Sequence, residues 1–362
     1  MTHLFHKNKV KQQDTFHTPR KFNYSLVPAA GYTLQTGFAG IVSANLGFYN
    51  YEEKEAKLSN IATSITYSEY NQIILPLTAN IWFNKGNYNF VSDNRYISYP
   101  SSIYGLGGRT DPNKARIINF SGLKLHNKLV KSFSGNWMAG LGLYYDQFWD
   151  ITVLDPSTKR ISTLIQKELG KSETAVGPIA NILYDSRTNQ INPDKGTYFN
   201  LLYRNNTTLL GSDNDWQSLI IDTRKYFKFP ANSQNVLAFW NLEWLTLSGK
   251  IPYLTMPSTG WDDQYNTGRG YIQSRFRGRN MSYLESEYRF QISRNGLFGG
   301  VVFANVQSFS GDLSSTYATL LPGYGAGLRL KINKHSKTNI CLDYGIGKNG
   351  SGGFYVNLGE VF

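Results

Sequence analysis

Several features that are common in folded proteins are rare or missing in this sequence. Cysteine occurs once, at Cys341, so no intramolecular disulfide can form. Proline accounts for only 12 of 362 residues. No run of about 18 apolar residues occurs, which excludes a membrane-spanning helix. Residues 1–20 hold three of the five histidines and no apolar core of the kind a signal peptide needs. A flexible tail explains these histidines better than a metal site, whose ligands need a rigid frame.

Motifs of enzymes are also missing. The sequence contains no Gly-x-Ser-x-Gly, no His-Glu-x-x-His and no phosphate-binding glycine loop before a helix. Glu285 and Glu287 lie two residues apart and could resemble an acid/base pair, but the arginines nearby would keep both carboxylates ionised. We therefore expect no enzymatic activity, no cofactor and no metal site.

The residues that are abundant indicate a β-barrel. Tyr, Phe and Trp make up 15% of the chain and glycine occurs 34 times, a composition typical of many strands, tight turns and aromatic girdles. A mean hydropathy of −0.37 is compatible with a membrane barrel, because half of each strand faces the water-filled lumen.

The net charge of +12 has several possible explanations. Nucleic acid is disfavoured because the basic residues are scattered over turns and loops rather than gathered in a stripe or a known module. On a barrel, the same excess has two interpretations. It can pair with lipid phosphates, or it can make the lumen cationic.

Short segments of alternating polarity, separated by turn residues, run from residue 22 to the end of the chain. They predict an all-β fold, a sixteen-stranded antiparallel transmembrane β-barrel. The expected strands are 22–31, 37–48, 60–70, 73–83, 88–99, 116–127, 136–146, 173–184, 197–204, 216–228, 236–246, the second half of 268–290, 297–309, 324–332, 338–347 and 353–362. Residues 1–21 are expected to be a disordered periplasmic tail, and 22–362 the outer-membrane barrel.

The lengths of the connections support this topology. Short links, at 84–87, 230–234, 293–296 and 333–337, all fall at one end of the barrel. Long connections, at 100–114, 147–172, 247–277 and 310–323, all fall at the other. An even number of strands places both termini at the end with the short links, which is the periplasmic end in outer-membrane barrels.

Side-chain direction is predicted from the alternation along each strand. In 236–246, Val236, Ala238, Trp240, Leu242 and Trp244 are expected to face outward, and Asn241 and Glu243 inward. In 73–83, Pro76 is expected inward, where its missing N–H favours a bulge.

The stretch from Gly268 to Phe290 organises the prediction. It begins as a glycine-broken loop with arginines at 269, 275, 277 and 279 and continues into a strand with Glu285, Glu287 and Arg289 on one face and Leu284, Tyr288 and Phe290 on the other. Four guanidinium groups need acidic partners or open water. From this segment alone, an exposed basic loop beside an ordinary amphipathic strand is equally compatible.

Three motifs resemble the BamA/TamA-like superfamily of outer-membrane assembly factors, also called the bacterial surface antigen family. They are Arg269-Gly270-Tyr271 followed by Glu287-Tyr288-Arg289-Phe290, the segment 184–196, and the ending from Gly323 to Phe362. The resemblance covers the chain from about Ala175 onward. It implies that the loop between the eleventh and twelfth strands folds into the barrel and that its arginine meets acidic residues on the inner wall.

The resemblance also implies a set of site residues, which we call the lumen lock: Arg269, Gly270, Tyr271, Glu287 and Asn305. Asn305 stands where the family has an aspartate and can accept only one hydrogen bond from a guanidinium, so Glu287 is expected to be the stronger partner. Glu285, Arg289 and Asp343 are expected as supporting charges, with Asp343 as a substitute acid. Alternatively, Arg269 only fills the pore.

The last strand carries a second functional signal. Phe354, Val356, Leu358 and Phe362 share the outward parity, and a final aromatic residue resembles the sorting signal read by barrel-assembly machinery. Gly359, with Gly352 and Gly353, weakens strand pairing and predicts a labile seam between the first and last strands. These glycines are nearly as well explained by relief of crowding at a barrel corner.

Together these features predict a barrel in the outer membrane of a Gram-negative bacterium that assists insertion or translocation of polypeptide or lipid. The alternative is a passive or plugged pore, favoured because residues 1–21 leave no room for the family's periplasmic domains. Expected partners are outer-membrane lipid including lipopolysaccharide, and client polypeptides or lipoproteins. We expect a monomeric barrel that does not bind nucleic acid.

Overall fold

A computed structural model describes residues 22–50, 57–155, 169–263, 265–311, 317, 319–333 and 337–362. The expected tail, 1–21, lies outside the described residues. Within them, no helix is long and apolar enough to cross a membrane.

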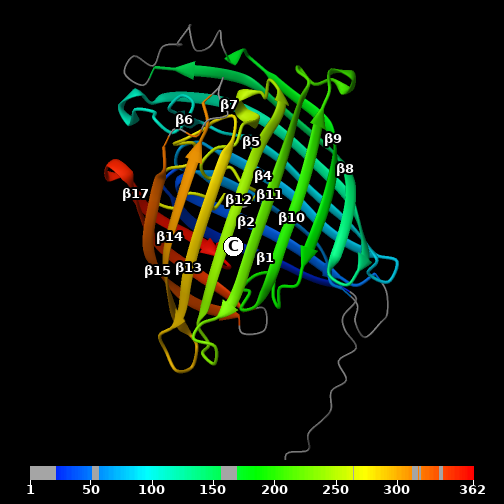
Figure 1. The fold of residues 1–362 in the computed structure, drawn as a ribbon, viewed down its shortest axis with the longest axis vertical. Helices are drawn as coiled ribbons and strands as arrows, with labels where there is room; N and C mark the ends of the chain where they lie inside the picture. Colours follow the sequence, from blue (N-terminus) through cyan, green and yellow to red (C-terminus); the bar gives the residue numbers. More distant parts are fainter. Residues whose placement is uncertain are drawn as a thin grey trace, which may run out of the picture.

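The described chain is almost entirely β-strand (Figure 1). The strands are β1 (Phe22–Thr33), β2 (Gly37–Phe48), β3 (Ser59–Ser68), β4 (Ile73–Phe83), β5 (Tyr88–Ser98), β6 (Ser101–Ile103), β7 (Arg116–Ser134), β8 (Trp137–Leu154), β9 (Glu173–Asp185), β10 (Gly196–Asn206), β11 (Trp216–Lys228), β12 (Val236–Gly249), β13 (Met281–Gln291), β14 (Phe298–Phe309), β15 (Leu321–Asn333), β16 (Thr338–Gly347) and β17 (Gly352–Leu358). Short 3-10 turns lie at Pro112–Lys114, Thr208–Leu210, Tyr253–Thr255 and Lys348–Gly350.

Each strand pairs antiparallel with its neighbour, and β17 returns to β1, so the sheet closes into a barrel. The three-residue β6 pairs with β7 beyond the point where β5 ends, so it continues the position of β5 in the wall. The wall therefore contains sixteen strands, as the alternation predicted. The four longest connections, which follow β6, β8, β12 and β14, lie at one end of the barrel, the loop end. The four short links predicted from the sequence lie at the other, the turn end (Figure 1).

Alternation explains why these segments form the wall. In β13, Leu284 is 49% exposed on the outer face, whereas Glu285 and Glu287 are fully buried on the inner face. In β8, Leu141 and Leu143 face outward, and Gly140 and Gly142 face inward. An outer surface of exposed aliphatic and aromatic side chains suits contact with lipid.

Two predictions about the strands were wrong. β7 and β8 extend to Ser134 and Leu154, so residues 147–154, expected in a loop, continue the wall. Pro76 causes no bulge, because the β3–β4 register is the same on both sides of it; the ladder only opens there, and the Thr63 hydroxyl donates to the Pro76 carbonyl at 2.8 Å.

The direction of β12 is also opposite to the prediction. Val236, Ala238, Trp240 and Leu242 are buried on the inner face. Asn241 and Glu243 are on the outer face, where Glu243 accepts hydrogen bonds from Asn241 (2.9 Å) and Ser282 (2.8 Å). The physical reason is that the lumen beside β12 contains protein rather than water: Trp240 packs against Tyr283 and Phe362.

The end of the chain differs most from expectation. β17 ends at Leu358, and the chain turns at Gly359, whose φ is +92°. Val361 and Phe362 are then 0% and 3% exposed, and the C mark lies over the middle of the barrel in Figure 1. The predicted outward position of Phe362 is therefore wrong, although Phe354 and Leu358 do face outward.

Candidate functional site in the barrel lumen

The connection between β12 and β13 lies inside the barrel. Most of its residues from Pro257 to Asn280 are buried, and it contacts strands far away in the sequence. The Tyr99 hydroxyl, just after β5, donates to Gln273 at 2.6 Å, and the Tyr271 hydroxyl donates to the Pro322 carbonyl of β15 at 2.6 Å. The loop thus crosses the lumen and is held on both sides of it.

Arg269 is the most enclosed charged group of this loop, with 1% of its surface exposed. Its guanidinium donates to Asp343 on β16 at 2.5 Å and to both Glu285 and Glu287 on β13. The Cζ atom of the guanidinium lies over the ring of Phe303 on β14, 3.7 Å from the ring centre. One loop side chain therefore joins three strands of the wall.

Gly270 is required by a close approach of two backbones. Its φ is +110°, and a Cβ there would lie 2.8 Å from the carbonyl carbon of Ile346. On the opposite side, a Cβ at Gly345 would lie 2.6 Å from the Gly270 nitrogen. Only glycine at both positions lets the loop lie directly on β16.

Asn305 has a different contact from the one predicted. Its side-chain amide donates to the backbone carbonyl of Arg269 at 2.9 Å rather than accepting from the guanidinium. Asp343 supplies the carboxylate in its place, and Glu285 contacts the guanidinium as directly as Glu287 does. The structure thus brings all five residues of the lumen lock and the supporting acids together.

A second layer of charges continues toward the turn end. Arg289 bonds Glu287 at 2.6 Å, and Arg329 bonds both Asp343 and Glu360, the latter at 2.8 Å. Glu360 belongs to the segment that turns inward after β17, and the Arg289 guanidinium donates to the Phe362 backbone oxygen at 2.9 Å. Removing one member of such a buried network leaves a charge uncompensated and costs roughly 3–5 kcal/mol.

Sequence reasoning missed Tyr355. Its hydroxyl accepts the Gly270 N–H at 2.9 Å and donates to the Tyr271 carbonyl at 2.8 Å. It also missed Arg329 and Glu360. A signal for Tyr355 was present, because the predicted outward parity of Phe354 and Val356 places Tyr355 inward.

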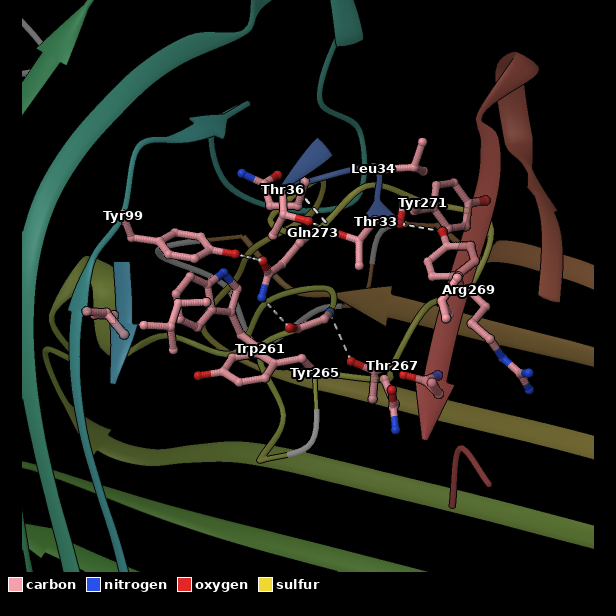
Figure 2. Close-up of a pocket in the computed structure, with 18 residues that line it drawn as sticks. Thr33, Leu34, Thr36, Tyr99, Trp261, Tyr265, Thr267, Arg269, Tyr271 and Gln273 are labelled. Atoms are coloured by element: carbon pink, nitrogen blue, oxygen red, sulfur yellow. Dashed lines mark hydrogen bonds between the residues drawn. The ribbon is translucent and has the colours of Figure 1, made fainter. Parts of the chain in front are cut away.

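A cavity of about 190 Å³ separates the loop from the first and last strands (Figure 2). Thr33, Leu34 and Thr36 line it from the β1–β2 connection, and Tyr355 lines it from β17. Trp261 and Tyr265 line it from the loop. The seam between the first and last strands is therefore not packed solidly against the loop.

The lumen as a whole is electrically balanced. Among the described residues, eleven basic side chains lie on the inner wall or in the part of the loop from Pro257 to Arg277: Arg95, Lys124, Lys128, Arg187, Arg204, Arg224, Arg269, Arg275, Arg277, Arg289 and Arg329. Eleven acidic ones face them: Asp93, Asp146, Glu173, Asp185, Asp222, Asp262, Asp263, Glu285, Glu287, Asp343 and Glu360. Within the same part of the chain, no group of three or more His, Cys, Asp or Glu residues is arranged to hold a metal ion.

Comparison with known proteins defines the fold. Solved structures that match include BamA from Haemophilus ducreyi lacking POTRA domains 1–3, with 12% identity, a TM-score of 0.59, and coverage of 92% of this chain and 68% of that one. CdiB from Acinetobacter baumannii matches with 14% identity and a TM-score of 0.60, covering 94% and 60%. CdiB from Escherichia coli matches with 12% identity and a TM-score of 0.63, covering 94% and 62%.

The chain thus has the barrel fold of BamA and CdiB, and it spans roughly 60–68% of the length of those chains. The resemblance to BamA/TamA-like barrels that the motifs predicted is confirmed at the level of the fold. No family model matches the sequence, and no curated protein matches it.

Proposed function

We propose that this protein is an outer-membrane barrel that assists insertion or translocation of polypeptide or lipid, without catalysis, by opening the seam between β1 and β17. The observation that carries the proposal is the weakness of that seam. The only residue pair between the two strands in the described structure is Thr33 with Tyr355. In contrast, β1 pairs with β2 along its whole length, from Phe22 to Thr33.

Most of the other edge of β1 is therefore unpaired within the described residues. β17 is only seven residues long, and the chain turns into the lumen after Leu358, so no other described strand pairs with this edge. Phe22, Tyr24 and Leu26 are 62%, 88% and 69% exposed. A long unpaired edge with apolar side chains is a template for another strand, and edge pairing is one of the recurring ways in which proteins bind extended polypeptide.

The filled lumen supports a lateral route. The loop, the lumen lock and the segment 359–362 occupy the interior between the seam and the opposite wall, so a client that passed straight through would have to displace a buried ionic network. Opening the seam separates few described contacts: the pair at Thr33 and Tyr355, the packing of Leu34 on Gly353, and the hydrogen bonds of Tyr355 with the loop.

A passive or plugged pore is the second candidate. The same filled lumen favours it, because a barrel that is closed by its own loop needs no client to explain its interior. The two candidates differ in what they require of the seam: assembly needs β1 to be reachable, whereas a plugged pore does not.

Depletion of the protein in its own organism tests the proposal. If the assembly role is right, other barrel proteins should accumulate unfolded, as seen by loss of their compact, heat-modifiable form in gels. Correct insertion of those barrels after depletion would exclude the assembly role and leave the passive or plugged pore as the remaining candidate. Lipopolysaccharide, client polypeptides and lipoproteins stay proposed partners, and capture by crosslinking from the turn end would identify them.

A further inference from the structure

The net positive charge of the barrel is concentrated at the turn end. Since the lumen is balanced, the excess lies elsewhere. The loop end is balanced too, with seven basic and seven acidic side chains among the described residues. The turn end has nine basic side chains and one acidic one, Asp194, in the described part of the chain. Within the described residues, the structure therefore does not support the interpretation that the excess of positive charge makes the lumen cationic.

The basic side chains are distributed around most of the barrel rather than gathered in a one-sided patch. Six of them are exposed, and we call these six the basic rim: Lys57, Lys85, Lys131, Lys195, Lys225 and Arg294. They lie next to strands distributed around the barrel, from β3 through β7 and β11 to β14. Lys228, Lys331 and Lys337 lie at the same level and are half-buried.

Part of the basic rim faces the membrane. Lys131 and Lys225 are on the outer faces of β7 and β11, close to the ends of these strands. Lys131 lies 5.6 Å from the ring of Tyr88, and Lys225 donates to the Thr197 hydroxyl at 2.8 Å. A lysine that lies along an apolar wall extends its ammonium group toward the polar headgroups.

Aromatic side chains mark the same level. On the outer wall near the turn end, Phe83 stacks on Tyr88 and Phe227 stacks on Phe239. Trp137 packs against Tyr184. Such a girdle lies at the boundary between hydrocarbon and headgroups. The basic rim thus lies at the height where lipid phosphates would be.

We propose that the basic rim binds the phosphate groups of anionic phospholipids in the membrane leaflet at the turn end. An acidic protein would need complementary charge on one side only, whereas lipid surrounds the barrel and the basic rim extends around most of it. The attraction is electrostatic, so each cation should strengthen binding by roughly five-fold and added salt should weaken it.

Native mass spectrometry of the detergent-purified barrel tests this proposal. The protein is mixed with equal amounts of phosphatidylglycerol and phosphatidylcholine of identical acyl chains, and the ratio of bound lipids is measured. The rim variant combines Lys131→Gln, Lys195→Gln, Lys225→Gln and Arg294→Gln. The matched control carries the same charge change at exposed lysines of the loop end: Lys114→Gln, Lys171→Gln, Lys250→Gln and Lys348→Gln.

The unmodified barrel should bind phosphatidylglycerol in excess, the rim variant should lose that preference by at least about tenfold, and the loop-end variant should keep it within about twofold. Heat-modifiable migration verifies folding. If the fourfold variant does not fold, the pair Lys131→Gln and Lys225→Gln should still lower the preference about five-fold or more. An unchanged ratio in the rim variant, or an equal fall in the loop-end variant, would overturn the proposal.

Discussion

The hydroxyl of Tyr355 accepts the backbone N–H of Gly270 at 2.9 Å, and this contact joins the seam of the barrel to the loop inside it. Tyr355 is also the residue of β17 that pairs with β1. The seating of the loop and the closure of the seam therefore depend on the same side chain, so a change in one should affect the other.

Tyr355→Phe should weaken both the attachment of the loop and the closure of the seam. The ring stays, but the Gly270 N–H and the Tyr271 carbonyl lose their partner, at a cost of roughly 1–3 kcal/mol for each group left unsatisfied. Amide hydrogen exchange should become faster at residues 268–273 and at Thr33. Tyr344→Phe, on the outer face of β16, is the control and should leave exchange at both places unchanged.

Arg269→Ala should be the most destabilising single change in the lumen lock. It leaves Glu285, Glu287 and Asp343 without their shared cation, which costs roughly 3–5 kcal/mol. The thermal midpoint, measured by heat-modifiable migration, should fall, and ion conductance in planar bilayers should rise.

Arg279→Ala is the matched control for Arg269→Ala, because Arg279 lies in the same loop and its described contact is a backbone carbonyl, that of Gly249. The Arg279→Ala variant should have nearly the same thermal midpoint and ion conductance as the unmodified protein. If Arg269→Ala left both the thermal midpoint and the conductance as they are, the lumen lock would have no role in holding the loop.

Gly270→Ala tests the close approach of the loop to β16. The left-handed φ costs an alanine roughly 1–2 kcal/mol, and the overlap with Ile346 adds roughly 1–3 kcal/mol. Gly350 also has a positive φ, but nothing lies within 4 Å of an added Cβ. Gly350→Ala should therefore show the backbone cost without the cost of overlap. Equal thermal midpoints for the two variants would contradict the packing argument.

Phe362→Ala separates a structural role from a sorting signal. Because Phe362 is buried against Trp240 and Tyr226, truncation should cost roughly 3–5 kcal/mol. This loss should be visible when the purified chain is folded into detergent without any assembly machinery. Phe354→Ala, on the exposed outer face, should cost much less. A side chain that served only as a sorting signal would leave the stability in detergent unchanged.

Much of the wall could be predicted because alternation separates the two faces of each strand. The number of strands and the two faces of β13 followed from it. β12 was misassigned because the alternation shows which face is apolar but not what that face contacts: Trp240 packs on protein inside the lumen. Phe362 was misplaced for a different reason: its outward parity would hold only if β17 continued past Gly359.

The contacts of the lumen lock were predictable only in part. The charge of Arg269 required either acidic partners or open water, and only the resemblance selected Glu287 as its partner. The choice of Asp343 on β16 depends on how the barrel curves, which brings together residues 74 positions apart. The role of Glu360 depends on a turn into the lumen for which no alternation pattern gives a signal.

A disulfide across the seam tests the central claim most directly. Extending the Thr33–Tyr355 register places Gly31 opposite Asn357, so Gly31→Cys with Asn357→Cys, in a Cys341→Ser background, closes the seam when oxidised. Gly31→Cys with Ala39→Cys crosslinks the paired strands β1 and β2 instead and is the control. The account predicts that the oxidised seam variant fails to support insertion of other barrels in cells depleted of the unmodified protein, that reduction restores it, and that the control supports insertion in both states. Full support by the oxidised seam variant would contradict the account.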